Sequence, residues 1–120
     1  MKNVLAGAAA LGLSVGVAQA ADEVTLQLQW VTQAQFAGYY VALDQGFYDE
    51  EDLAVTIKPG GPDIAPPQVL AGGGADVMLN WMPSALAARE RGLPVVSIAR
   101  PFRNSGLVLT SWEATGSAGP

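Results

Sequence analysis

A regular alternation between strand-like and helix-like segments constrains the fold of this chain more than any other feature. Residues 24–30 alternate apolar and polar side chains, as expected for a strand with one buried face. Further strands are expected at 54–58, 75–79 and 94–99, with another beginning at 107–110, and helices are expected between the first four of these strands. This order predicts an α/β fold in which helices cover both faces of a mainly parallel sheet.

The expected helices have recognisable end signals. The first covers 36–45, and Gly46 suits the left-handed position just past its end. Asp63 is expected to cap the second helix, which runs to the glycines at 72–74 and has prolines 66 and 67 in its first turn. Ser84 is expected to cap the third, which ends near Arg91, with Gly92 beyond it.

The two ends of the chain have a different character. Residues 1–20 are interpreted as a cleavable signal peptide, with Lys2 before an apolar stretch and Ala18-Gln19-Ala20 as the cleavage site. A membrane anchor is the alternative, but the stretch is rich in Gly and short for the ~20 apolar residues of a membrane span. The interpretation predicts export to the periplasm. Residues 112–120 form an irregular tail without a pattern.

Composition excludes several classes of function. Without Lys2 the mature chain keeps five basic and all eleven acidic residues, a net charge of −6, which argues against binding to nucleic acid or to anionic lipid. The chain has no Cys and no His, so thiolate chemistry and the commonest general base are both missing. Its acids do not have the spacing of a calcium loop. We therefore expect no metal and no cofactor.

In an open parallel sheet, ligands bind outside the carboxyl ends of the strands. Three loops are expected to leave such ends here, at 30–35, 60–63 and 80–84, and each leads into a helix whose N-terminal N–H groups suit a small polar or anionic solute. The glycines at 72–74 follow a helix and precede a strand, which is the reverse of a phosphate-binding loop.

The candidate ligand-binding residues lie in or next to these loops. Each has a structural alternative that the sequence leaves open: Trp30 and Tyr39 as core aromatics, Asp63 and Ser84 as helix caps, Gln35 as a solvated side chain, and Asn80 and Trp81 as structural residues at the end of a strand. Phe36 and Tyr40 are expected in the core.

Three stretches carry a resemblance to a known family: QWVTQAQFAGYYVALDQGFYDEEDL, GGPDI and GGADVMLNWMPSALAARERGLPVVSIA. Over residues 24–109 the chain resembles the thiamine-pyrimidine synthase-like family of periplasmic solute-binding proteins. The resemblance implies a type II periplasmic-binding-protein lobe and a monomer that delivers its ligand to an ABC permease in the inner membrane. The implied ligand is a hydroxymethylpyrimidine-like thiamine precursor. A sulfonate, taurine, nitrate or riboflavin is the alternative.

The resemblance also implies roles for individual residues. Trp30, Tyr39 and Trp81 would stack on a flat ring, and Gln35, Asp63 and Asn80 would form hydrogen bonds with it. The synthases that share this fold consume one of their own histidines, and Phe36 stands at that position here. A binding protein is therefore expected rather than an enzyme.

Members of this family are longer than this chain and close two lobes around the ligand. We expect residues 21–111 to form the first lobe only, which makes the sheet incomplete and the chain a fragment. A non-functional remnant is the third interpretation, besides a binding protein and a synthase-like enzyme.

Overall fold

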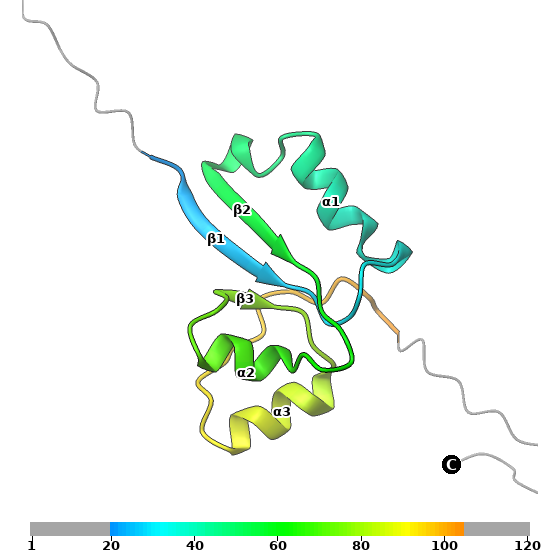
Figure 1. Cartoon of the computed structure of the whole chain (residues 1–120), viewed down its shortest axis with the longest axis vertical. Coiled ribbons are helices and arrows are strands. Elements are labelled where there is room, and N and C mark those ends of the chain that lie inside the picture. The colour runs from blue at the N-terminus through cyan, green and yellow to red at the C-terminus, as the bar shows by residue number, and fades with distance from the viewer. Residues whose placement is uncertain (1–19, 105–120) are drawn as a thin grey trace, which may run out of the picture.

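The structure is a computed structural model that describes residues 20–104. It contains three strands, three α-helices and two short 3-10 helices, in the order β1 (Asp22–Gln27), η1 (Ala34–Phe36), α1 (Ala37–Asp44), η2 (Asp49–Glu51), β2 (Leu53–Lys58), α2 (Pro66–Ala71), β3 (Val77–Met78) and α3 (Met82–Glu90). In the view of Figure 1, α1 lies beyond β2, and α2 and α3 lie beyond β3.

The three strands form one parallel sheet in the order β2-β1-β3. Gln27 at the end of β1 pairs with Lys58 at the end of β2 and with Met78 at the end of β3. The carboxyl ends of all three strands therefore meet at one edge. The prediction of an α/β fold is confirmed, and the arrangement is that of part of a periplasmic-binding-protein lobe.

The core lies on the face of the sheet that α1 covers. Leu26, Leu28 and Phe36 form its buried centre, and Leu28 is fully buried. Partly buried side chains from the strands and from α1 pack around this centre: Tyr39, Tyr40, Val55, Ile57, Val77 and Leu79. Side chains alternate between the two faces of a strand, so the apolar residues of β1 and β2 reach this face together.

The opposite face is polar and lies under α2, which contacts β1 and β3. Gln27 is 2% exposed, and its Nε2 donates to the carbonyl oxygens of Leu28 and Pro59, both at 3.1 Å. Lys58 Nζ donates to Gly74 O, just after α2, at 2.7 Å. Hydrogen bonds compensate the burial of the Gln27 amide, whereas Lys58 is exposed. α1 packs on one face of the sheet and α2 contacts the other, as predicted.

The helix ends agree in part with the end signals in the sequence. Gly46 and Gly92 have φ values of 76° and 93°, so each glycine occupies the predicted left-handed position. The prediction that Asp63 caps α2 is wrong. Ala65 occupies the N-cap position, two residues after Asp63, and its methyl side chain has no acceptor; the N–H of Gln68 donates to Ala65 O instead.

The prediction that Ser84 caps α3 is also wrong. The helix begins at Met82, and Trp81 precedes it in an extended conformation. Pro83 fits the first turn of a helix, where no N–H donor is needed, and α3 starts three residues earlier than predicted. Ser84 lies inside its first turn.

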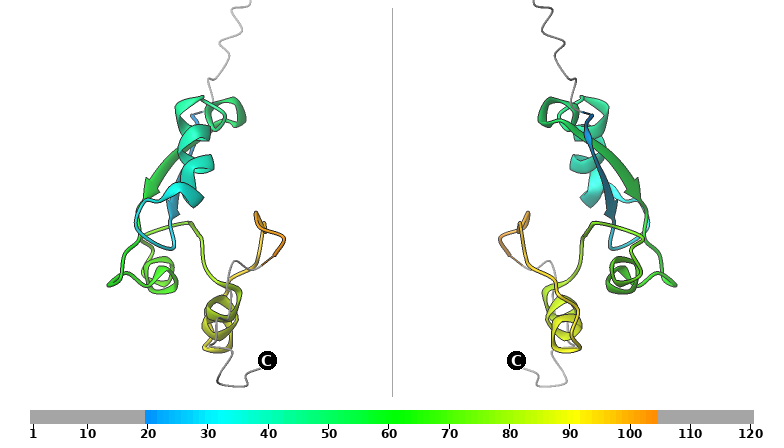
Figure 2. Two further views of the ribbon diagram at one scale, coloured as in Figure 1. Left: turned by 90° about the vertical axis from the view of Figure 1, so that its right-hand side faces the viewer. Right: turned by 90° about the vertical axis from the view of Figure 1, so that its left-hand side faces the viewer.

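The strand predicted at 94–99 is absent. This segment pairs with no strand among residues 20–104, and Val96 and Ile98 are 75% and 76% exposed. In Figure 2 the yellow and orange segment after α3 runs apart from the sheet. A strand exists only as part of a hydrogen-bonded ladder, and the apolar pattern alone does not supply a partner. The predicted strand at 107–110, the tail at 112–120 and nearly all of the predicted signal peptide lie outside the described residues.

Among residues 20–104, none of the helices has the length and apolar character that crossing a membrane requires.

Candidate functional site

A cavity of about 310 Å³ lies at the carboxyl edge of the sheet, lined by Gln29, Trp30, Gln35 and Trp81. The side chain of Trp30 is 41% exposed and that of Trp81 is 54% exposed, so both indoles present surface to solvent. The volume is within the range of small-molecule sites, and its lining combines two aromatic walls with two amides. The structure therefore brings together three of the predicted site residues: Trp30, Gln35 and Trp81.

The Trp30 wall is held by backbone contacts. Strand pairing continues beyond β1 and β2, because Leu28 N donates to Lys58 O at 2.8 Å and Gly60 N donates to Trp30 O at 2.9 Å. A Cβ on Gly60 would lie 2.5 Å from Leu28 O and 2.7 Å from Trp30 N. Only a glycine permits this close approach, which explains in physical terms the first residue of the GGPDI stretch.

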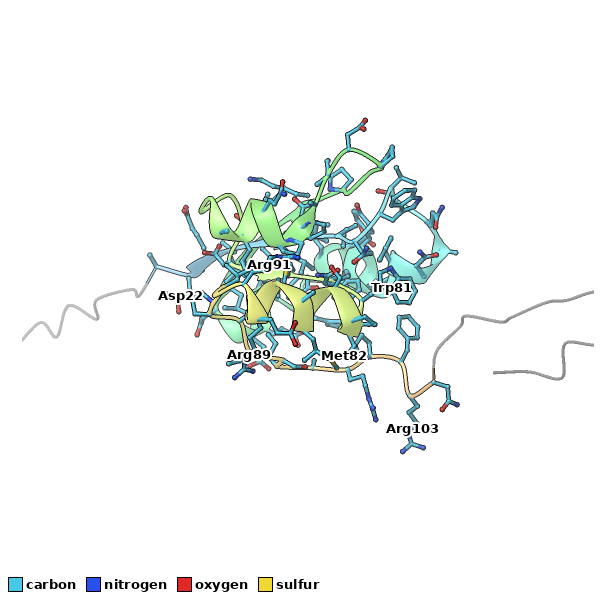
Figure 3. All side chains as sticks on the ribbon, turned by 90° about the horizontal axis from the view of Figure 1, so that it is seen from below. Asp22, Trp81, Met82, Arg89, Arg91 and Arg103 are labelled. Atoms are coloured by element: carbon cyan, nitrogen blue, oxygen red, sulfur yellow. The ribbon has the colours of Figure 1, made fainter. Side chains whose placement is uncertain are left out.

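The Trp81 wall is held by side-chain amides. The orientation of the Gln29 amide that suits all its neighbours has Nε2 donating to Leu79 O at 3.2 Å and to Asn80 Oδ1 at 2.8 Å. In this orientation Oε1 accepts from Trp81 Nε1 at 3.3 Å. Figure 3 shows Trp81 beside Met82 at the start of α3.

Hydrogen bonds of Asn80, one of them with Ser84, stabilise this wall. Asn80 Oδ1 also accepts from Trp81 N at 2.9 Å, and Asn80 Nδ2 donates to Ser84 Oγ at 3.1 Å. The Asn80 oxygen thus receives two donors from the protein itself. Within the described residues, the two predicted ligand contacts Asn80 and Ser84 hold the wall and do not line the cavity.

Gln35 reaches the cavity from η1, which begins the segment leading into α1. The hydroxyl groups of Thr32 and Tyr40 lie 3.0 Å apart and join this loop to α1. Phe36 anchors the same segment in the core, where it is 5% exposed. The segment that carries Gln35 is therefore fixed on both sides, by Thr32 before it and by Phe36 after it.

The family model described as "NMT1/THI5 like" matches residues 33–116, which is more than half of the chain. The chain belongs to the NMT1/THI5-like family.

Individual relatives agree with this assignment. A protein of Halalkalibacterium halodurans named formylaminopyrimidine-binding protein is 34% identical over 86 residues, which cover 72% of this chain and 26% of the relative. A putative thiamine biosynthesis protein of Haemophilus influenzae is 27% identical over 86 residues, covering 71% and 27%. A protein of Legionella pneumophila named 4-amino-5-hydroxymethyl-2-methylpyrimidine phosphate synthase is 35% identical over 79 residues, covering 64% and 24%.

The NMT1/THI5-like chain thus spans about a quarter of the length of the relatives that it matches. Its relatives include a protein named for binding and proteins named as synthases. Membership in the family confirms the predicted resemblance, and the names of these relatives refer both to binding and to synthesis of pyrimidine compounds.

Two predicted site residues lie away from the cavity. Tyr39 packs against the core cluster, as its structural alternative predicted. Burial raises the pKa of the Tyr39 phenol, and the neighbouring Tyr48 adds to this rise. Asp63 is exposed in the loop before α2 and does not line the cavity.

Gln29 is the site residue that the sequence analysis missed. Its polar side chain falls within an alternating strand pattern, where a polar residue is read as facing solvent. The available signal was its position immediately before Trp30, at the carboxyl end of the strand, where parallel sheets bind ligands. No group of three His, Cys, Asp or Glu side chains in the described part of the chain is arranged to hold a metal ion.

Proposed function

We propose that this chain is the pyrimidine-recognising part of a periplasmic solute-binding protein that serves an ABC importer. The observation that supports this proposal is the cavity between Trp30 and Trp81, with the amides of Gln29 and Gln35 in its lining. A flat ring stacks favourably on indole faces, and the amide of Gln35 can both donate hydrogen bonds to a ligand and accept them from it. An aminopyrimidine has matching donors and acceptors around its ring.

The charge of the lining favours a neutral ligand over an anionic one. The four lining residues are uncharged, and Arg100 and Arg103 are exposed and do not line the cavity. A sulfonate or nitrate that loses its water in such a site needs compensating donors or cations. A pyrimidine precursor does not need them, so we rank it above taurine, sulfonates and nitrate.

The proposal takes binding, not synthesis, as the function. Synthases of this fold are expected to present a reactive histidine where this chain has Phe36. Here Phe36 is 5% exposed and belongs to the core cluster with Leu26 and Leu28. A buried phenyl ring provides no reacting group. The relative named for binding formylaminopyrimidine is consistent with the same role.

Location and partner complete the proposal. Residues 1–20 have the charge, the apolar stretch and the small-residue site of an export signal, so we place the mature chain in the periplasm. A permease in the inner membrane would then receive the ligand.

A titration followed by NMR tests the proposal on the chain itself. The indole N–H signals of Trp30 and Trp81, assigned with Trp30→Phe and Trp81→Phe variants, are followed while hydroxymethylpyrimidine or formylaminopyrimidine is added to millimolar concentration. Both signals are expected to shift, and taurine and nitrate are expected to leave them in place. A shift with taurine or nitrate and none with either pyrimidine would overturn the proposal.

A further inference from the structure

The environment of the Gln29 amide determines its orientation. Two acceptor oxygens, Leu79 O and Asn80 Oδ1, lie 3.2 Å and 2.8 Å from one end of the amide, and one donor, Trp81 Nε1, lies 3.3 Å from the other. Only the NH₂ group can face two acceptors, and only the oxygen can face an indole N–H. Both N–H groups of Nε2 therefore donate to acceptors inside the protein.

The backbone of Trp81 is tied to α3, because Ala85 N donates to Trp81 O at 2.9 Å, whereas its indole N–H donates to the Gln29 amide alone among the described residues. Trp81 precedes α3 in an extended conformation and is 54% exposed. Its backbone N–H donates to Asn80 Oδ1, the same oxygen that Gln29 Nε2 contacts. The amides of Gln29 and Asn80 thus restrain both the backbone and the indole of Trp81.

We propose that Gln29 is a positioning residue that holds the Trp81 indole as a fixed wall, so that the width of the cavity is set before a ligand arrives. The effect of Gln29 on ligand affinity rests on the proposed function, whereas its restraint of the Trp81 indole does not. A side chain that is already fixed loses less conformational entropy when a ligand binds, so Gln29 contributes to affinity by restraining Trp81.

The wild-type chain provides the first test, without any ligand. Trp81 is 54% exposed as a whole residue and Trp30 is 41% exposed, so exposure of the residues alone predicts faster exchange of the indole N–H at Trp81. Within residues 20–104, only the Trp81 indole N–H has a protein acceptor. We expect the opposite order: the indole N–H of Trp81 should exchange about 10-fold more slowly than that of Trp30, because one hydrogen bond must break before it exchanges. Faster exchange at Trp81 would overturn the proposal.

Variants provide the second test. Gln29→Ala is expected to remove the protection of the Trp81 indole and to move its signal upfield. Gln29→Asn, whose amide is one methylene shorter, is expected to restore the protection only in part. Gln68→Ala is the matched control, because Gln68 is exposed on α2 and distant in sequence from the cavity.

Ligand binding separates this inference from the proposed function. If hydroxymethylpyrimidine binds, Gln29→Ala should weaken it about 5-fold, by loss of the preset wall. If no pyrimidine binds but Gln29→Ala still releases the Trp81 indole, the positioning role stands and the proposed ligand is wrong. If the Trp81 signal and its exchange are the same in Gln29→Ala and wild type, the positioning role is wrong, whatever the ligand does.

Discussion

The two aromatic walls of the cavity are held by different means. Trp30 follows β1, and its position is set by the backbone pairing of Trp30 O with Gly60 N and by the close approach of Gly60 to Leu28. Trp81 precedes α3, and its position is set by the side chains of Gln29 and Asn80. One wall is thus an extension of the sheet, and the other is attached to the sheet by amides.

This difference predicts different responses to substitution. A backbone contact tolerates no extra atom, because neither chain can withdraw without breaking the ladder. A side-chain contact can be removed one hydrogen bond at a time, at a modest cost for each bond. Changes at the Trp30 wall should therefore affect the stability of the whole fold, and changes at the Trp81 wall should affect mainly the site.

The largest effect is expected for Gly60→Ala, which places a methyl group 2.5 Å from Leu28 O. The two segments must separate, and we expect a loss of about 3 kcal/mol in the free energy of unfolding, measured with urea. Gly38→Ala is the matched control, because a Cβ there meets nothing within 4 Å and the residue lies in α1. It should stabilise the chain by up to about 0.5 kcal/mol. Equal stabilities of the two variants would contradict the contrast between the walls.

A smaller effect is expected for Asn80→Ala at the other wall. The variant loses the bonds to Gln29 Nε2, Trp81 N and Ser84 Oγ, all near the surface, and we expect a loss of about 1 kcal/mol. The Trp81 indole signal should broaden or shift, and the Trp30 signal should not. Asn104→Ala, at an exposed Asn, is the control for removing an amide. A variant that disturbs Trp30 as much as Trp81 would show that the two walls are not independent.

The smallest effect is expected at high pH, from a residue outside the cavity. Burial, and secondarily Tyr48, raises the pKa of Tyr39 above its ordinary value of 10.0. Above pH 10 the unfolded chain releases this proton while the folded chain retains it, so stability is lost as pH rises toward the raised folded pKa. In Tyr39→Phe the urea midpoint should fall less between about pH 9 and pH 11 than in wild type. An identical fall of the urea midpoint in both proteins would argue against this linkage. The indole signals of Trp30 and Trp81 should be the same in Tyr39→Phe as in wild type.

The Trp30 wall was largely predictable from sequence, because it depends on local pattern. Alternation over residues 24–30 located the strand, and the order of segments placed the loops after β1, β2 and β3 at one edge. The strong turn-forming residues around Gly60 marked a loop. The contact of Gly60 with Leu28 was not predictable, because it joins segments that are far apart in the chain.

The Trp81 wall was less predictable, because it depends on partners that the pattern does not reveal. Trp81 itself stood out as an aromatic residue after a buried strand, but Gln29 read as an ordinary polar strand residue. Asn80 and Ser84 were expected to face a ligand, and their hydrogen bonds run within the protein. These two bonds are local, as is common for Asn side chains at the start of a helix. Only the contacts of Gln29 join segments far apart in the chain, and such contacts are set by tertiary structure.

The segment at 94–99 shows a second limit of pattern reading. Its apolar residues match a strand, yet Val96 and Ile98 are almost fully exposed. Apolar pattern predicts burial only if a neighbouring element supplies the other surface, and β3 forms just two pairs with β1.

The central place of β1 bears on how relatives of this chain can diverge. Both walls depend on the residues that follow β1, since Trp30 belongs to them and Trp81 is attached through Gln29. Inserting or deleting one residue there would turn the side chains that follow it in the paired segment, Trp30 among them, to the opposite face. Gaps in an alignment should therefore be excluded from residues 28–30 and tolerated at 62–65, where the loop is exposed.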